Sequence, residues 1–117
     1  LHMLDYVESY GYSSKLMESL TGEKIKPLIN VGAIGLSSQA INWHEVERWV
    51  KELEAREGKT YYLEQAITAM IIGNAPAIPL PAREYVVNPK STATCVLHHY
   101  VDLSKEYYYK LAWRQFI

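Results

Sequence analysis

The placement of proline and glycine constrains the fold of this chain more than any other feature of its sequence. Four of the five prolines lie between residues 74 and 89. Because proline lacks a backbone N–H and clashes with the preceding helical turn, this stretch excludes a helix and permits only short edge strands. The best strand within it runs from Arg83 to Val87. Glycines at positions 22, 58 and 73 each follow a run with helical spacing, so they are predicted to end helices.

Two helices are predicted in the first half of the chain. A cap at Ser13 or Ser14 predicts a helix through Leu20. Asn42 and Glu45 have the form of a capping box for a second helix. Apolar residues then recur on one helical face up to the next glycine, namely Trp43, Val46, Trp49, Val50 and Leu53.

Two more helices are predicted in the second half. Thr60 can cap a helix that runs from Tyr61 to about Ile72. Its apolar stripe consists of Leu63, Ile67, Met70 and Ile71. Asp102 or Ser104 can cap the final helix. Its apolar face is predicted to hold Tyr108, Leu111, Ala112 and Phe116.

Two apolar stretches are predicted to be strands. Leu28–Leu36 is too short and too rich in glycine for a helix, and its glycines allow another backbone or a ligand to approach closely. Ala93–Val101 is rich in β-branched and apolar residues. Residues 1–12 are expected to open with a helical turn. These elements predict an α/β fold of the mixed α+β kind, with a small mixed sheet of about three to four strands packed by about four helices.

Length and composition narrow the class of protein. The 117 residues suit a single domain, residues 1–117, with residues 1–24 as a helical lead-in. Lys and Arg number 12 against 13 Asp and Glu, which argues against a nucleic-acid partner because binding phosphates needs a surplus of basic side chains. No apolar run reaches the roughly 20 residues of a transmembrane segment. The single Cys95, predicted to be an inert thiol within a strand, excludes an intrachain disulfide and fits a cytoplasmic protein.

The histidine pair His98–His99 and Lys105 lie where a predicted strand ends and a helix begins. Successive strand side chains point to opposite faces, so the two histidines are not expected to bind one metal ion together. One imidazole, with Asp102 nearby, can give a single ligand to a divalent ion that carries phosphate. The helix dipole disfavours a lysine in the first turn, which a bound anion would explain better. The alternative is a structural histidine pair and a solvated lysine.

Glu64 and Gln65, at the start of a predicted helix, and Asn30, within a predicted strand, are further candidates. A carboxylate beside an amide can hydrogen-bond sugar hydroxyls or stabilise positive charge at an anomeric carbon. Glu64 can equally compensate the helix dipole. A buried Asn30 must be hydrogen-bonded, either to its own fold or to a ligand, and the sequence leaves both open. Ten Tyr and three Trp against one Phe suit pocket walls that contact sugars or nucleotides, and equally an ordinary wet interface.

Taken in order, these motifs resemble the second half of a GT-A-type glycosyltransferase domain, in the group that contains glycogenin and the bacterial galactosyltransferases. The segment LINVGAIGL resembles the group's F-N-x-G-V strand through Asn30 and Gly32. The segment YYLEQAITAM resembles its D-Q helix through Glu64–Gln65. The segment HYVDLSKEY resembles its H-F-x-G-x-x-K-P-W motif through His99 and Lys105. The resemblance covers residues 25–117, which is about half of a complete catalytic domain.

The resemblance implies transfer of a sugar from a nucleotide-sugar donor to an acceptor. It implies that His99 is the protein ligand of Mn²⁺ or Mg²⁺ and that Lys105 holds the donor's diphosphate. A divalent cation and a lysine would together neutralise the charge on a leaving nucleoside diphosphate. The sugar and acceptor pocket would be lined by the remaining motif residues, with Glu64 or Gln65 near the anomeric carbon: Asn30, Gly32, Glu64 and Gln65.

The sequence also departs from that group. Asp102 replaces its Gly, Glu64 replaces its Asp, and Glu106–Tyr107 replace its Pro-Trp pair. The group's Asp-x-Asp metal motif has no counterpart, since the only aspartates are Asp5 and Asp102. We therefore expect a fragment of a glycosyltransferase that is inactive without a nucleotide-binding half. The alternative is a noncatalytic module that self-associates as a homo-oligomer through the Tyr- and Trp-rich surface exposed without that half.

Overall fold

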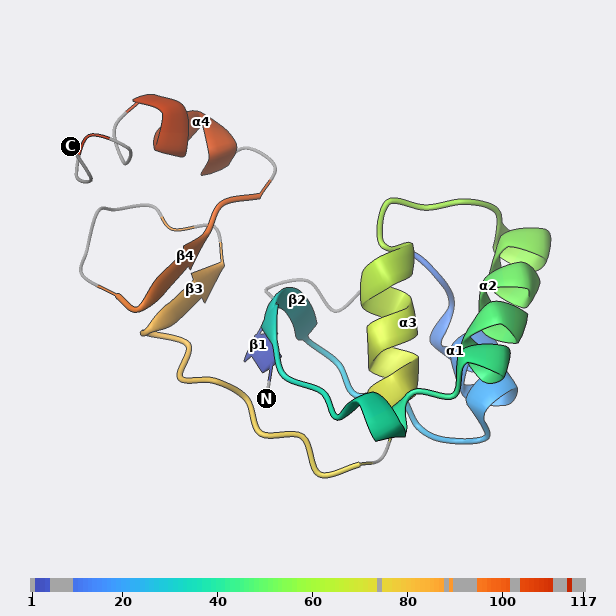
Figure 1. The fold of residues 1–117 in the computed structure, drawn as a ribbon. Coiled ribbons are helices and arrows are strands. Elements are labelled where there is room, and N and C mark those ends of the chain that lie inside the picture. The colour runs from blue at the N-terminus through green and yellow to red at the C-terminus, as the bar shows by residue number, and fades with distance from the viewer. Residues whose placement is uncertain are drawn as a thin grey trace.

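The computed structural model of the chain describes residues 2–4, 10–73, 75–87, 89, 95–101, 104–110 and 114. Figure 1 shows how the helices and strands of these residues are arranged. In chain order they are β1 (His2–Leu4), α1 (Ser14–Thr21), β2 (Ile29–Ile34), the 3-10 helix η1 (Ser38–Ala40), α2 (Trp43–Glu57), α3 (Leu63–Ile72), β3 (Tyr85–Val87), β4 (Leu97–His99) and α4 (Ser104–Lys110). The predicted mixed α/β class is confirmed, with four α-helices and four strands in the described part of the chain.

The four strands form two pairs. β1 runs antiparallel to β2, and β3 runs parallel to β4. Residues 78–80 lie along β1, since the His2 N–H donates to the Ile78 carbonyl at 3.3 Å and the Leu80 N–H donates to the His2 carbonyl at 2.8 Å. Pro79 has no N–H to donate, so it forms only an isolated bridge to His2. The strands expected in one small sheet are therefore divided between two pairs among the described residues.

The hydrophobic core surrounds α3. This helix contacts β2, α1 and α2, and Figure 1 shows the three helices grouped on one side of the β1–β2 pair. Ala66, Ala69 and Met70 of α3 are buried against Met17 of α1 and Leu53 of α2 in one cluster. Because α3 buries side chains around most of its circumference, tertiary contacts rather than an amphipathic stripe stabilise its ten residues.

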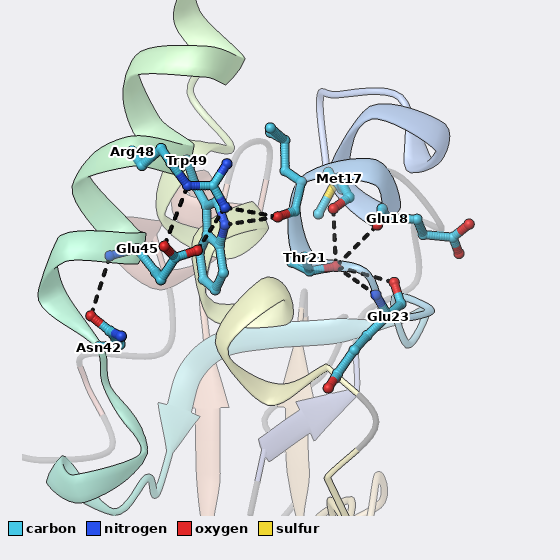
Figure 2. Close-up of polar contacts among 9 residues, drawn as sticks. Met17, Glu18, Thr21, Glu23, Asn42, Glu45, Arg48 and Trp49 are labelled. Atoms are coloured by element: carbon cyan, nitrogen blue, oxygen red, sulfur yellow. Dashed lines mark hydrogen bonds and ion pairs between the residues drawn. The ribbon is translucent and has the colours of Figure 1, made fainter.

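Polar groups of α2 add to the apolar contact between α1 and α2 (Figure 2). Arg48 and Trp49 both donate to the carbonyl of Leu20, in the last turn of α1, at 3.0 and 3.3 Å. This carbonyl would otherwise lack a partner, because the last four carbonyls of a helix have none within it. Asn42 caps α2 as predicted, accepting from the Glu45 N–H at 3.3 Å. The Glu45 carboxylate does not return to the cap but pairs with Arg48 at 2.6 Å.

Two buried tyrosines, which lie just before α1, form hydrogen bonds with distant parts of the fold. The Tyr10 hydroxyl donates to the Lys26 carbonyl and accepts from the Ile29 N–H at 3.0 Å. The Tyr12 hydroxyl donates to the Gly58 carbonyl at 3.0 Å. An apolar ring with a polar tip suits this role, because the ring is buried while the hydroxyl satisfies backbone groups. These two contacts place the start of β2 and the end of α2.

Several local predictions are wrong. The expected helical turn within residues 1–12 is replaced at His2–Leu4 by strand β1, because pairing with β2 decides the conformation of so short a segment. Trp43, predicted on the buried face of α2, is 70% exposed because it is the first helical residue and lies before the buried stripe. Cys95 precedes β4 and is half-buried, so it does not lie within a strand.

Helix ends agree with the sequence more closely. Ser13 caps α1 by accepting from the Leu16 N–H at 3.3 Å, and Gly22 ends this helix in the left-handed conformation. Thr60 does not cap α3 directly: its hydroxyl accepts from the Tyr62 N–H in a turn, and the helix begins at Leu63. The predicted cap Asp102 and the face residues Leu111, Ala112 and Phe116 of the last helix lie outside the described residues.

Within the described residues, no helix combines the length and apolar character needed to cross a membrane.

Candidate functional site

The centre of the candidate site is strand β2, which carries Asn30 and Gly32. Asn30 is only 4% exposed, and its side-chain oxygen accepts from the Gly32 N–H at 2.8 Å. β2 contacts α3 on the helical side, so the strand is held from that side by the core. The buried Asn30 is therefore hydrogen-bonded to its own fold, which is one of the two possibilities that the sequence left open.

Gly32 contacts the imidazole of His99 on β4. A Cβ at position 32 would lie 2.5 Å from Cδ2 and 2.6 Å from Cγ of His99, and 2.9 Å from Oδ1 of Asn30. Real Cβ atoms essentially never come within 3.0 Å of another heavy atom, so only glycine permits this contact. Asn30, Gly32 and His99, which the sequence singled out in two separate motifs, therefore lie together.

The two residues predicted to be catalytic, Glu64 and Gln65, point in different directions on α3. Gln65 is 8% exposed and belongs to the buried side of the helix, whereas Glu64 is exposed in the first turn. Neighbouring residues on a helix point in directions about 100° apart, which accounts for the difference. Glu64 therefore presents its carboxylate to solvent, while Gln65 is a buried polar residue of the core. The helix itself contacts β2, which carries Asn30 and Gly32.

Lys105 is exposed in the first turn of α4. The Ser104 hydroxyl joins the start of this helix to Val101, accepting from its N–H at 2.9 Å and donating to its carbonyl at 2.7 Å. Because its side chain is exposed, Lys105 does not need a partner within the fold to stabilise its charge. Its position suits either of the two explanations given by the sequence, a bound anion or solvation.

His98 and His99 contact different partners. The His98 Nδ1 lies 3.1 Å from the Tyr100 hydroxyl, and the two rings meet edge to face at 5.7 Å. Tyr100 also packs against Tyr108 of α4, with ring centroids 5.3 Å apart. Burial raises the pKa of the Tyr100 hydroxyl above its usual value. No role was predicted for Tyr100, although its place directly after the histidine pair is the signal that would have found it.

The described residues alone do not fit a divalent metal site. Within the part of the chain that the structure describes, no three His, Cys, Asp or Glu side chains are grouped so as to hold a metal ion. Mg²⁺ and Mn²⁺ prefer several oxygen ligands, so a single imidazole at His99 does not complete a site for either ion. Asp102, the carboxylate expected nearby, lies outside the described residues.

Another histidine, His2, is a buried polar residue that was not among the candidates predicted from the sequence. It is 5% exposed in β1, between residues 78–80 and β2. The three-residue strand is too short for its alternation to be recognised in the sequence. Comparison of the chain with protein-family models, with curated proteins and with solved structures finds no match.

Proposed function

We propose that this chain is the acceptor-side portion of a GT-A-type glycosyltransferase, which moves a sugar from a nucleotide-sugar donor to an acceptor. The observation that carries the proposal is the contact of Gly32 with His99 beside Asn30. These residues belong to two motifs that are distant in the sequence and that both resemble the same enzyme group. If the two resemblances were due to chance, there would be no reason for the two segments to lie in contact. Nor would there be a reason for a glycine at the position where their contact leaves no room for a Cβ.

In this proposal the charged residues of the site act on the donor and on the transferred sugar. Lys105, exposed at the start of α4, neutralises charge on the donor's diphosphate as it leaves. Glu64, exposed at the start of α3, is the carboxylate that stabilises positive charge near the anomeric carbon. Gln65 is buried, so we assign it to holding α3 against the core rather than to contact with the sugar.

The proposal requires a second, nucleotide-binding part. A GT-A enzyme of this group uses an Asp-x-Asp segment, and this sequence contains only Asp5 and Asp102. The Mn²⁺ or Mg²⁺ ion therefore enters the proposal only with the complete enzyme, where such carboxylates would join His99. We place the complete enzyme in the cytoplasm, supported by the single Cys95.

The test is a calorimetric titration of a nucleoside diphosphate and Mn²⁺ into the chain joined to an Asp-x-Asp segment found in the same reading frame. His99→Ala and Lys105→Ala are each expected to weaken binding about tenfold or more, a difference of about 1.4 kcal/mol. His44→Ala and Lys24→Ala are matched controls, because both residues are exposed and lie on the helical side of the molecule. Equal affinity of all four variants, or the absence of any Asp-x-Asp segment, would overturn the proposal.

A second candidate function is that of a noncatalytic module that associates with copies of itself. Several large aromatic side chains are exposed, including Trp43 at 70%, Tyr61 at 84% and Tyr109 at 72%. Exposed aromatic rings are enriched at protein interfaces because they bury much area with few rotatable bonds. Sedimentation velocity would detect dimers or larger species as the protein concentration rises. A single monomeric species at high concentration would exclude this function.

A further inference from the structure

The pairing of β1 with β2 contains a bulge around Gly32. His2 lies opposite Ile34, but the next residue, Met3, lies opposite Asn30. One step along β1 therefore corresponds to four along β2, and residues 31–33 have no residue of β1 opposite them. Bulges bend a strand and change the direction of its side chains, and they are common beside functional sites.

Asn30 closes this bulge. Its side-chain oxygen accepts from the N–H of Gly32, two residues further along, which is the hydrogen-bond pattern of an Asx turn. Gly32 is half-buried, so a backbone N–H that has left the strand ladder here is better satisfied by another acceptor, and Asn30 supplies it. With an exposure of 4%, the side chain is directed into the fold.

The bulge in turn sets the position of His99. The side of Gly32 that lacks a Cβ faces the His99 ring, and an added Cβ there would come within 2.6 Å of two ring carbons. Gly32 does not have a positive φ, so the glycine is required by this contact and not by the backbone conformation. Any change in the shape of the bulge would move the surface on which the imidazole rests.

We propose that Asn30 is a positioning residue, which fixes the bulge of β2 so that the imidazole of His99 is held in one orientation against Gly32. It acts on chemistry through His99 and does not itself contact the sugar or the acceptor. The chemical use of this orientation rests on the proposed function. The positioning itself is a property of the folded chain and can be measured without a substrate.

The experiment is nuclear magnetic resonance on the 117-residue chain. A strong proton–proton contact is expected between Gly32 Hα and His99 Hδ2, whose signal is assigned by its loss in His99→Gln. Asn30→Leu, which keeps a similar volume but has no acceptor, is expected to abolish this contact and to speed hydrogen exchange at the Gly32 amide. Asn30→Asp, which retains an acceptor oxygen, is expected to restore both.

Asn42→Leu is the matched control, because Asn42 also accepts a backbone N–H but lies at the start of α2. This variant is expected to leave the Gly32–His99 contact unchanged. If Asn30→Leu does not fold, Asn30→Ala is compared with Asn30→Asp by the same signals. Persistence of the contact in Asn30→Leu or Asn30→Ala would overturn the proposal, as would its loss in Asn30→Asp. None of these signals depends on nucleotide binding, so this result and that of the proposed function are separate.

Discussion

Tyr10 allows the packing argument to be tested by removing a single oxygen atom. Its ring is 5% exposed, and its hydroxyl joins the Lys26 carbonyl to the N–H of Ile29, the first residue of β2. Tyr10→Phe keeps the ring and leaves both backbone groups without this partner. An unsatisfied buried donor or acceptor costs about 1–3 kcal/mol. Because Ile29 is fully buried whereas Lys26 is half-buried and within reach of water, we expect a total loss of about 2–3 kcal/mol.

Tyr12→Phe is the matched control for this substitution. The Tyr12 ring is also buried, but its hydroxyl donates at 3.0 Å to the carbonyl of Gly58, which is exposed to water, and the Thr60 backbone beside it is only half-buried. Because water can replace the hydroxyl at these groups, its loss should lower the free energy of unfolding by about 1 kcal/mol. Urea unfolding followed by circular dichroism measures both variants, with equal m-values showing that the same folded state is compared. A loss in Tyr10→Phe no greater than that in Tyr12→Phe would refute the claim that Tyr10 satisfies two backbone groups at the start of β2.

Two further predictions concern the backbone and the pH dependence of stability. Leu28 has a φ of 62°, in the left-handed region, so Leu28→Gly should be about 1 kcal/mol more stable than Leu28→Ala in urea unfolding, and equal stabilities would contradict this conformation. Hydrogen bonds from the Ser13 hydroxyl and N–H hold the pKa of Glu57 below its usual value. A lowered pKa gives stability above the unfolded pKa that is lost as the pH falls through the folded one. Lowering the pH from about 5 to about 3 should therefore reduce the stability of the wild type more than that of Glu57→Gln. Thermal unfolding measures this, and an equal fall of the melting temperature with pH in both proteins would exclude the effect.

The helix ends could be predicted because their causes lie within a few residues. Ser13 and Asn42 each accept from an N–H three residues further along, and Gly22 takes the left-handed conformation that ends a helix. The predicted burial of Trp43 was wrong, because helical spacing alone does not show which turn of the helix first contacts the core. The helical turn predicted where β1 lies was wrong for a similar reason, since the conformation of β1 depends on pairing with a strand more than 20 residues away.

Three of the candidate residues could be grouped from the sequence, but their geometry could not. Sequence spacing and resemblance selected Asn30, Gly32 and His99, and the structure brings these three together. They did not reveal that Asn30 accepts from Gly32, because that bond depends on the bulge opposite β1. Nor did they separate Glu64 from Gln65, since which of two adjacent helical residues is buried depends on how α3 packs.

Among the described residues, two backbone irregularities lie in β2 and directly before it. Leu28, with its positive φ, comes directly before β2, and the bulge occupies the middle of the same strand. In a regular strand Asn30 and Gly32 would share a face, and the Gly32 amide would be committed to a ladder or to an open edge. The bulge transfers that amide to the Asn30 side chain and leaves the bare face of Gly32 toward His99. A left-handed leucine persists only where surrounding contacts determine it, and the Tyr10 bond to Ile29, the next residue, is such a contact. The start of β2 is thus held from the helical side of the fold, so substitutions at Tyr10 should be felt at the His99 contact as well as in stability.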